Sequence, residues 1–254
     1  KIKLELKMSQ TFSGWGMNTY GTRPPWNNQN TIENKIFSTV HKDLLNLLEQ
    51  KKFYLTQFYY KDTNYKKILE ELQWRHYIVF NSVLHSINFS EDEEINIVEC
   101  GVCDGLTVHF AMKACEFKNK NFNSYLYDTW AELRSTEEVL RFKYAYLDIE
   151  TTKHNLQYFS KNTIYNKGLI PDIFTSAKNP EKINWLHVDL NSNNATLKTL
   201  EFFYDKITHN GVILFDDYGG FDDTRKIIDN FFENKKGHFI SLPTGQGIFY
   251  KNNK

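Results

Sequence analysis

The sequence has few cysteines, no excess charge of either sign and no long apolar run. Its 254 residues include three cysteines, and a small odd number does not make a disulfide framework. Reduced thiols are typical of the cytosol, so we expect a cytoplasmic protein. No stretch approaches the roughly 18 apolar residues that span a bilayer, and no basic segment followed by an apolar one resembles a secretory leader. We therefore expect no membrane partner.

The charged residues of the two signs balance. Lys plus Arg and Asp plus Glu number 31 each, so the formal net charge is zero. Proteins that bind nucleic acids normally carry a basic excess, and no dense run of Lys and Arg is present here. We therefore expect no nucleic-acid partner. The length and the hydrophobic content of 41% are sufficient for one large domain with a substantial core.

The first third of the chain contains helical patterns and an irregular segment. The segment FSGWGMNTYGTRPPWNNQN is rich in Gly, Pro, Asn and aromatic residues, which is incompatible with a regular helix or strand. Its Trp15 and Trp26 either stack on a ligand or pin the segment to the rest of the protein. Apolar residues then recur every three or four positions over residues 31–50 and 65–88, which predicts two amphipathic helices.

From Ile95 onward, short apolar runs alternate with helical patterns. The runs are INIVEC (95–100), NSYLYD (123–128), NTIYN (162–166), NWLHVD (184–189) and GVILFD (211–216). This alternation predicts an α/β fold with a doubly wound, mostly parallel sheet. Two further runs, HFISL and GIFYK, flank PTGQG and predict an antiparallel hairpin at the C-terminus, which brings the number of strands to seven.

Several of the predicted strands end in acidic residues. Asp189 ends one strand, and Asp216 and Asp217 end another. In an open parallel sheet, ligands bind beyond the carboxyl ends of the strands, so these carboxylates are expected to converge. Converging carboxylates raise one another's pKa, and a divalent cation with oxygen ligands, such as Mg²⁺, removes the conflict. The alternative for Asp217 is that it caps the helix that follows.

Two glycines mark the turn after the first predicted strand. Gly101 and Gly105 allow the backbone to approach a ligand closely, although their spacing differs from that of dinucleotide-binding turns. Asp128 ends the second strand, where an acid suits a bifunctional partner such as a ribose diol. Together with Glu99 in the first strand, these residues predict a cofactor-binding turn.

Two other features of the strand ends have competing interpretations. Cys100 and Cys103 form a C-x-x-C pair, but zinc would need two further ligands and only Cys115 remains. We therefore expect no metal or redox role, and we interpret Cys100, which ends an apolar strand, as an ordinary buried residue. His187 lies two residues before Asp189 and therefore on the same side of its strand. It is a candidate general base, a partner of the acidic residues, or a packed core histidine.

The segments IVECGVCDGLTVHFA, YLYDTW, LHVDLNSNNAT and GVILFDDYGG, in this order and spacing, resemble the class I S-adenosylmethionine-dependent methyltransferases. More narrowly, they resemble the macrocin O-methyltransferase family, metal-dependent enzymes that methylate sugar hydroxyls. The resemblance covers roughly residues 95–250 and implies a Rossmann-like fold. Its more specific part is the late half, which includes TGQGIF and the helix with Arg225, Asp229 and Phe231.

The resemblance implies a role for each candidate residue. The residues implied to bind S-adenosylmethionine are Glu99, Gly101, Gly105 and Asp128. Those implied to bind a divalent cation, Mg²⁺ by expectation, are Asp189, Asp216 and Asp217. The catalytic proton acceptor is expected to be Asp189 or His187. The family usually has a second Asp and a Tyr where this chain has Asn191 and Asn193, which puts a fourth ligand and the acceptor contacts in question.

By the same resemblance, residues 91–254 are expected to form the S-adenosylmethionine-binding domain. Residues 1–90 are expected to supply a lid segment and a helical cap that serves as a dimerisation arm. The expected acceptor is a nucleotide-linked sugar for surface (capsular) polysaccharide or glycoside biosynthesis. Two rival hypotheses are a metal-independent methyltransferase that acts on a phenolic or other small hydroxyl, with His187 as base, and a non-catalytic cofactor-binding scaffold.

Overall fold

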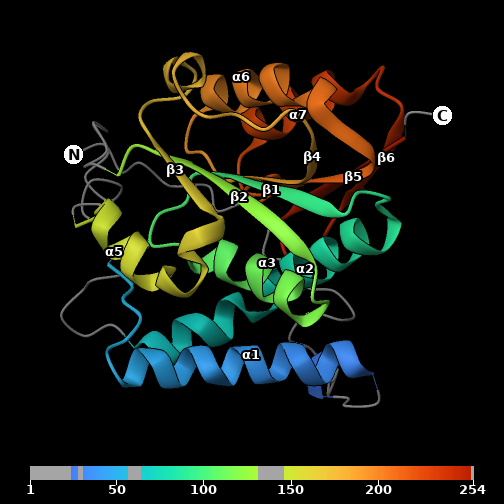
Figure 1. The fold of residues 1–254 in the computed structure, drawn as a ribbon. Coiled ribbons are helices and arrows are strands. Elements are labelled where there is room, and N and C mark those ends of the chain that lie inside the picture. Colours follow the sequence, from blue (N-terminus) through green and yellow to red (C-terminus); the bar gives the residue numbers. More distant parts are fainter. Residues whose placement is uncertain (1–23, 28–30, 57–63, 131–145, 253–254) are drawn as a thin grey trace, which may run out of the picture.

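A seven-stranded sheet lies at the centre of the protein, with helices on both of its faces (Figure 1). The structure is a computed structural model that describes residues 24–27, 31–56, 64–130 and 146–252. The strands are β1 Glu94–Cys100, β2 Asn121–Asp128, β3 Thr163–Lys167, β4 Ile183–Val188, β5 Ile207–Phe215, β6 Gly237–Ser241 and β7 Gly247–Lys251. Their order across the sheet is β3-β2-β1-β4-β5-β7-β6.

The first five strands pair in parallel, and the last two form the antiparallel hairpin that extends the sheet beyond β5. The predicted α/β class, with a mostly parallel sheet and a C-terminal hairpin, is therefore confirmed. Central strands that are covered on both faces are expected to be apolar throughout rather than alternating. Strand β4 meets this expectation, because all six of its residues are buried.

Two groups of helices cover the two faces of the sheet (Figure 1). The helices are α1 Ile32–Glu49, α2 Tyr65–Phe89, α3 Leu106–Phe117, α5 Ile149–Asn155, α6 Asn193–Phe203 and α7 Asp222–Phe232, with short 3-10 segments at Pro25–Asn27, Gln157–Asn162, Asp172–Thr175 and Tyr204–Lys206. Helices α1, α2, α3 and α5 lie on one side, and α6 and α7 lie on the other. Side-chain caps define several starts, since Thr31, Asn64 and Ser192 each accept a hydrogen bond from the third backbone N–H beyond them.

Helix α2 packs directly on the sheet as part of the main core. Its buried residues Val79, Phe80 and Val83 belong to the same apolar cluster as Ile95 and Ile97 of β1. The two predicted regions, 1–90 and 91–254, thus share one core, while the boundary between them and the predicted dimerisation role stay predictions. This packing also places the middle of α2 beside the carboxyl end of β5, which matters for the site below.

Trp26 pins the start of the described chain to the helices. It is 5% exposed and its ring lies against Phe37, Trp74 and Tyr77, with ring centroids between 4.7 and 5.6 Å apart. Of the two roles predicted for this residue, the packing role is the one observed. Trp15 and most of the predicted lid segment lie outside the described residues.

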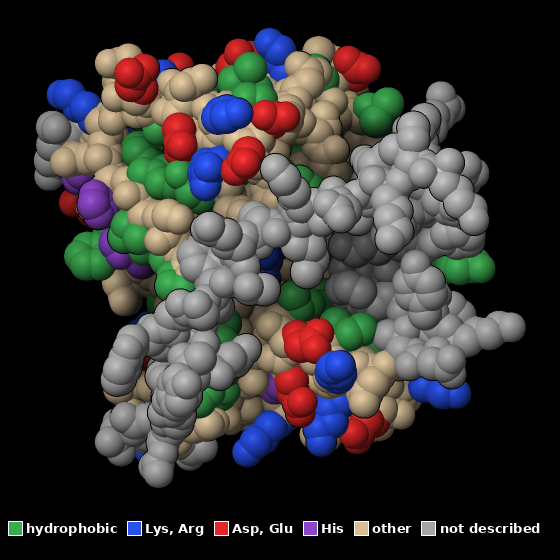
Figure 2. Space-filling model, turned by 180° about the vertical axis from the view of Figure 1, so that it is seen from behind, with side chains coloured by type: hydrophobic (Ala, Val, Ile, Leu, Met, Phe, Trp, Pro, Cys, Tyr) green, Lys and Arg blue, Asp and Glu red, His purple; other side chains and the backbone are tan. Residues whose placement is uncertain are grey.

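The surface agrees with the balanced composition. Figure 2 shows one face, on which Lys and Arg side chains lie among Asp and Glu side chains rather than in a patch of one sign. Within the described ranges, no helix combines the length and the apolar character that crossing a membrane requires.

Candidate active site

The carboxyl edge of the sheet brings the predicted acidic residues together. The backbone ladder continues one residue beyond the strands, because Asp189 N–H donates to Cys100 O at 2.9 Å and Asp216 N–H donates to Val188 O at 3.1 Å. These bonds fix the backbone on which the two side chains stand. The convergence that the strand pattern predicts is therefore observed for Asp189, Asp216 and Asp217, which line one cavity.

The turn after β1 needs glycine because the chain packs tightly against its own backbone at that point. Gly101 has φ of +88°, and a Cβ atom there would lie 1.9 Å from the backbone carbonyl oxygen of Asp189. Gly105 has φ of +84° and precedes the first residue of α3. The turn after β1 can therefore lie directly against the end of β4, and it does so only because position 101 has no side chain.

Asp128 organises the same turn from the neighbouring strand. Its Oδ2 accepts hydrogen bonds from the backbone N–H groups of Val102 and Cys103, at 2.7 and 2.8 Å. Its Oδ1 accepts one from Trp130 N–H at 2.9 Å. The carboxylate thus holds the glycine turn in place, and it also lines a cavity.

Two cavities lie at this edge, and they share a wall made by Gly101, Cys103, Asp189 and Asn191. The smaller, of about 180 Å³, extends over the end of β2 and is lined further by Asp128, Thr129, Leu147, Gly168, Leu169, Ile170, Leu190, Ser192 and Ala195, with Tyr127. The larger, of about 290 Å³, extends toward α2 and is lined further by Leu72, Arg75, His76, Val79, Val102, Leu106, Thr107, Asp216, Asp217 and Gln246. Asp189 therefore stands where the two cavities meet.

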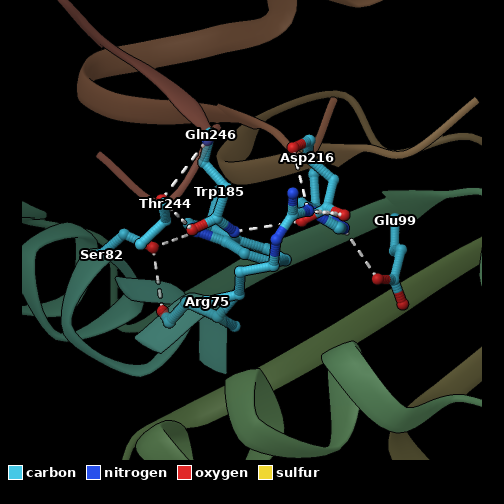
Figure 3. Close-up of polar contacts among 9 residues, drawn as sticks. Arg75, Ser82, Glu99, Trp185, Asp216, Thr244 and Gln246 are labelled. Carbon is cyan, nitrogen blue, oxygen red and sulfur yellow. Dashed lines mark hydrogen bonds and ion pairs between the residues drawn. The ribbon is translucent and has the colours of Figure 1, made fainter. Parts of the chain in front are cut away.

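Asp216 is held by two side chains that the sequence analysis did not identify. The Arg75 guanidinium, from α2, donates to Asp216 Oδ2 and also to its backbone carbonyl, the latter at 3.0 Å. Gln246, from the turn before β7, donates through Nε2 to Asp216 Oδ1 at 3.1 Å. Figure 3 shows Arg75 and Gln246 approaching Asp216 from different elements. Both carboxylate oxygens are therefore engaged.

Behind Asp216 lies a buried pair, Glu99 of β1 and His187 of β4. His187 Nδ1 is 2.8 Å from Glu99 Oε1, and the two side chains are 0% and 1% exposed. Burial alone lowers the pKa of His187, but the hydrogen bond and charge of Glu99, with the charges of Asp216 and Asp189, more than offset it, so that pKa is raised. His187 Nε2 lies 4.0 Å from Asp216 Oδ1 and has no hydrogen-bond partner among the described residues. Neither Glu99 nor His187 lines either cavity.

Asp189 is the least satisfied acid of the site. Burial, followed by the negative charges of Asp216 and Asp217, raises the pKa of Asp189 well above its usual value. Its carboxylate receives no hydrogen bond from the described residues, whereas both oxygens of Asp216 receive one. An acid of this kind takes up a proton readily, which is what a general base must do.

The predicted metal site is not supported by this arrangement. Within the described residues there is no group of three or more His, Cys, Asp and Glu side chains placed to hold a metal ion. Asp216, the central member of the predicted set, already bonds Arg75 and Gln246. The alternative role of Asp217 is wrong, because α7 starts at Asp222 and its N-cap position is Phe221.

Cys100 is buried, as predicted, whereas Cys103 is half-buried and lines both cavities. Cys100, Cys103 and Cys115 are free thiols, and two of them are buried. Burial raises the pKa of the Cys100 and Cys115 thiols, so both remain protonated at neutral pH.

Arg75 and Gln246 escaped the sequence analysis for different reasons. Arg75 shares a helix face with Leu72, His76 and Val79, at intervals of three and four residues, and all of them line the larger cavity. A charged residue on a helix face that also carries Leu72 and Val79 is the signal that would have identified it. Gln246 lies within the TGQGIF segment, whose role as a turn was predicted without a role for its side chain.

Comparison with known proteins agrees with this geometry. Residues 98–218 match the family described as a methyltransferase domain. No curated protein matches the chain by sequence. The structure of the O-methyltransferase NovP is similar, with a TM-score of 0.68 and 13% identity, over 87% of this chain and 100% of NovP.

Two further solved structures share the fold. The calicheamicin methyltransferase CalS11 matches with a TM-score of 0.52 and 14% identity, over 95% of this chain and 99% of CalS11. The protein PaMTH1 of Podospora anserina, bound to S-adenosylhomocysteine (SAH), matches with a TM-score of 0.51 and 11% identity, over 92% of this chain and 100% of that one. Residues 98–218 are therefore similar to a methyltransferase domain, and the chain shares the Rossmann-like fold of these solved methyltransferases.

Proposed function

We propose that this protein transfers the methyl group of S-adenosylmethionine to a hydroxyl group of a nucleotide-linked sugar. The observation that carries the proposal is that two cavities, one suited to a nucleoside and one suited to a polyol, meet at Asp189. A transfer reaction needs its donor and acceptor on either side of such a junction, because catalysis of this kind is mainly positioning. CalS11 is described as a TDP-rhamnose 3'-O-methyltransferase, and its shared fold is consistent with a sugar acceptor.

The smaller cavity suits the cofactor. Leu147, Leu169 and Leu190 give it apolar walls against which a flat base packs, and Asp128 supplies a carboxylate for the ribose hydroxyls. Asp128 oxygens have lone pairs beyond those used by the backbone N–H groups, so they accept further hydrogen bonds. When bound, S-adenosylmethionine supplies a methyl group activated by its sulfonium. The predicted cofactor role of Glu99 has no direct basis, since Glu99 bonds His187, which lies beside Asp216, and lines neither cavity.

The larger cavity suits a sugar. Arg75, Thr107, Asn191, Asp217 and Gln246 give it a polar lining that offers hydrogen bonds to several hydroxyl groups. Asp189, at the junction, accepts the proton of the hydroxyl that becomes methylated, so that proton leaves the oxygen as the methyl group joins it. His187 lies too deep to touch the acceptor, and we assign it to the support of Asp216 rather than to proton transfer.

The metal-dependent form of this reaction, which the macrocin family resemblance implies, has a weak structural basis here. Both oxygens of Asp216 already accept a hydrogen bond, and Arg75 supplies a positive charge in direct contact with this carboxylate. We therefore expect transfer to continue in a strong chelator. Transfer that stops with chelator and returns with Mg²⁺ would reinstate the metal-dependent form.

Two measurements test the proposal. Calorimetric titration with S-adenosylmethionine and with SAH should show one site per chain. Incubation with methyl-labelled S-adenosylmethionine and a panel of nucleotide sugars and phenols should then place the label on a sugar hydroxyl. Label on a phenol alone would favour the rival small-hydroxyl hypothesis, and binding without any transfer to the panel would favour the scaffold hypothesis.

The cellular location, the oligomeric state and the biosynthetic role of the protein stay predictions. Free thiols at Cys100, Cys103 and Cys115 are consistent with a cytoplasmic location. We keep the homodimer and the role in surface polysaccharide or glycoside biosynthesis as predictions, which sedimentation analysis and the identity of the accepted sugar will test.

A further inference from the structure

The Arg75–Asp216 contact is a largely buried ion pair between distant parts of the chain. Arg75 lies in the middle of α2 and Asp216 follows β5, and their side chains are 26% and 19% exposed. The guanidinium donates to a carboxylate oxygen and to the backbone carbonyl of the same residue. Both bonds come from the same guanidinium nitrogen, Nη1, and together they fix the position of the Asp216 side chain relative to its own backbone.

Other side chains close the remaining directions around Asp216. Gln246 Nε2 bonds Oδ1 at 3.1 Å, and His187 Nε2 lies 4.0 Å from the same oxygen. A divalent cation that binds Asp216 would have to share the carboxylate oxygens with Arg75 and Gln246, because each oxygen already accepts a hydrogen bond. It would also experience the repulsion of a guanidinium in direct contact with its ligand, and that repulsion is strong where water is scarce.

We propose that Arg75 is the built-in counter-ion of the acidic cluster: it supplies the positive charge that Asp189, Asp216 and Asp217 together require, and it keeps divalent cations from binding there. The inference deepens the proposed function and rests on it for its consequence in methyl transfer. With Asp216 neutralised by Arg75, Asp189 is left as the carboxylate of the junction that is free to accept a proton. Arg75 is thus a positioning residue, which acts through Asp216.

This role for Arg75 explains how the protein tolerates the mutual repulsion of Asp189, Asp216 and Asp217. Three carboxylates in one cleft are unfavourable without a cation, and the chain provides that cation from a helix outside the acidic strand ends. A buried carboxylate that loses its partner becomes an uncompensated charge. Removal of Arg75 should therefore raise the affinity of the acidic cluster for a divalent cation. That affinity can be measured without an acceptor substrate.

The test measures Mn²⁺ binding by electron paramagnetic resonance and calorimetry on the full chain. We expect the wild type to bind Mn²⁺ weakly and Arg75→Gln to bind it at least about tenfold more tightly, a change of about 1.4 kcal/mol. Arg75→Lys keeps the positive charge and should remain close to the wild type. Arg75→Gln combined with Asp216→Asn should lose the gain, and Arg225→Gln, which removes an exposed ion pair on α7, should gain nothing.

The outcomes are decisive in both directions. Tight Mn²⁺ binding by the wild type that Asp216→Asn abolishes would overturn the proposal, and this arm needs no Arg75 variant. A folded Arg75→Gln protein, with normal SAH affinity and no gain in Mn²⁺ affinity, would overturn it too. Since metal binding is measured without an acceptor, a failure of the sugar assay would refute the proposed function while leaving this result standing.

Discussion

An aspartate at the amino edge of the sheet and one at the carboxyl edge have pKa values shifted in opposite directions. At the amino edge, Asp92 accepts a hydrogen bond from the Asn184 side chain at 2.9 Å, and that bond is the main reason why the pKa of Asp92 is lowered. At the carboxyl edge, burial and neighbouring carboxylates raise the pKa of Asp189. Both residues stand at strand ends of the same sheet, so the difference comes from their partners and not from the secondary structure.

At the amino edge, the buried side chain of Asn184 has hydrogen-bond partners for both its donor and its acceptor atoms. Asn184, 1% exposed, donates to Asp92 and to Ser90 Oγ, and it accepts from the backbone N–H of Asn96. The carboxyl edge instead leaves His187 Nε2 and one oxygen of Glu99 without partners among the described residues. Unsatisfied buried polar groups are costly, and these two lie beside Asp216, so this edge carries a cost that the hydrogen bonds of Asn184 avoid at the other edge.

The comparison is tested most strongly by removing the charge of Asp189. Asp189→Asn should lower the rate of methyl transfer by about 10²- to 10⁴-fold, because a positioned general base typically contributes that much. SAH affinity, measured by calorimetry, should stay within a few-fold of the wild type. The matched change at the other edge, Asp92→Asn, should leave the transfer rate per folded molecule unchanged, and equal losses in both variants would contradict the distinction.

The glycine turn is tested next by giving Gly101 a side chain. Gly101→Ala places a methyl group against the Asp189 carbonyl in a left-handed conformation, which should cost about 2–5 kcal/mol of unfolding free energy. Denaturant unfolding with SAH titration measures both consequences, since cofactor affinity should fall as well. Gly220→Ala is the control, because its Cβ would lie 3.6 Å from the nearest atom. A stable, cofactor-binding Gly101→Ala protein would show that the turn is not held as described.

At the amino edge, we expect a substitution of Asn184 to lower stability without lowering activity. Asn184→Ala removes hydrogen bonds to Asp92, Ser90 and Asn96, and we expect it to cost about 1–3 kcal/mol of unfolding free energy. Urea unfolding measures the loss. Transfer activity at a temperature where the variant is folded should match that of the wild type, and a large loss of activity there would place function at both edges.

The smallest effect is a difference in pH dependence. The lowered pKa of Asp92 means that its contribution to stability is present above its unfolded value of about 3.9 and is lost as pH falls through the folded value. The raised pKa of Asp189 works the other way, since stability falls as pH rises from about 3.9 through the folded value. Thermal unfolding should therefore show Asp92→Asn less stable than the wild type at pH 7, and Asp189→Asn at least as stable.

In acid, below both folded pKa values, each variant should match the wild type, because the native carboxylates are then protonated as well. As the pH rises, Asp92→Asn should thus become less stable than the wild type, while Asp189→Asn should become at least as stable as the wild type. Parallel curves for the two variants would mean that the two edges do not differ in the way described.

Much of the fold could be predicted from local patterns. The strand ends and the acidic residues that follow them were predicted because a buried strand is a continuous apolar run and polar residues stop it. Helix α5 was missed, since its sequence IETTKHN carries no apolar periodicity. The start of α7 was misplaced in the alternative for Asp217, because the turn from Asp217 to Phe221 delays the helix.

The site could be predicted only in part, because its charge balance is made by tertiary contacts. Asp216 and Asp217 appear in the sequence as two unpaired charges, and a metal ion was the natural partner to infer. The partner of Asp216 in the structure, Arg75, comes from a helix that neither spacing nor motif connects to β5. Gln246 likewise reaches Asp216 only because the C-terminal hairpin places β7 beside β5.

A crystal structure of the wild-type protein with SAH, the accepted nucleotide sugar and Mg²⁺ in the crystallisation solution tests the arrangement around Asp189 most directly. We predict adenosine in the smaller cavity with its ribose at Asp128, and a sugar hydroxyl within hydrogen-bond distance of Asp189. We also predict that Arg75 still bonds Asp216. A metal ion bound by Asp189, Asp216 and Asp217, with Arg75 displaced, would contradict it, as would a sugar bound away from Asp189.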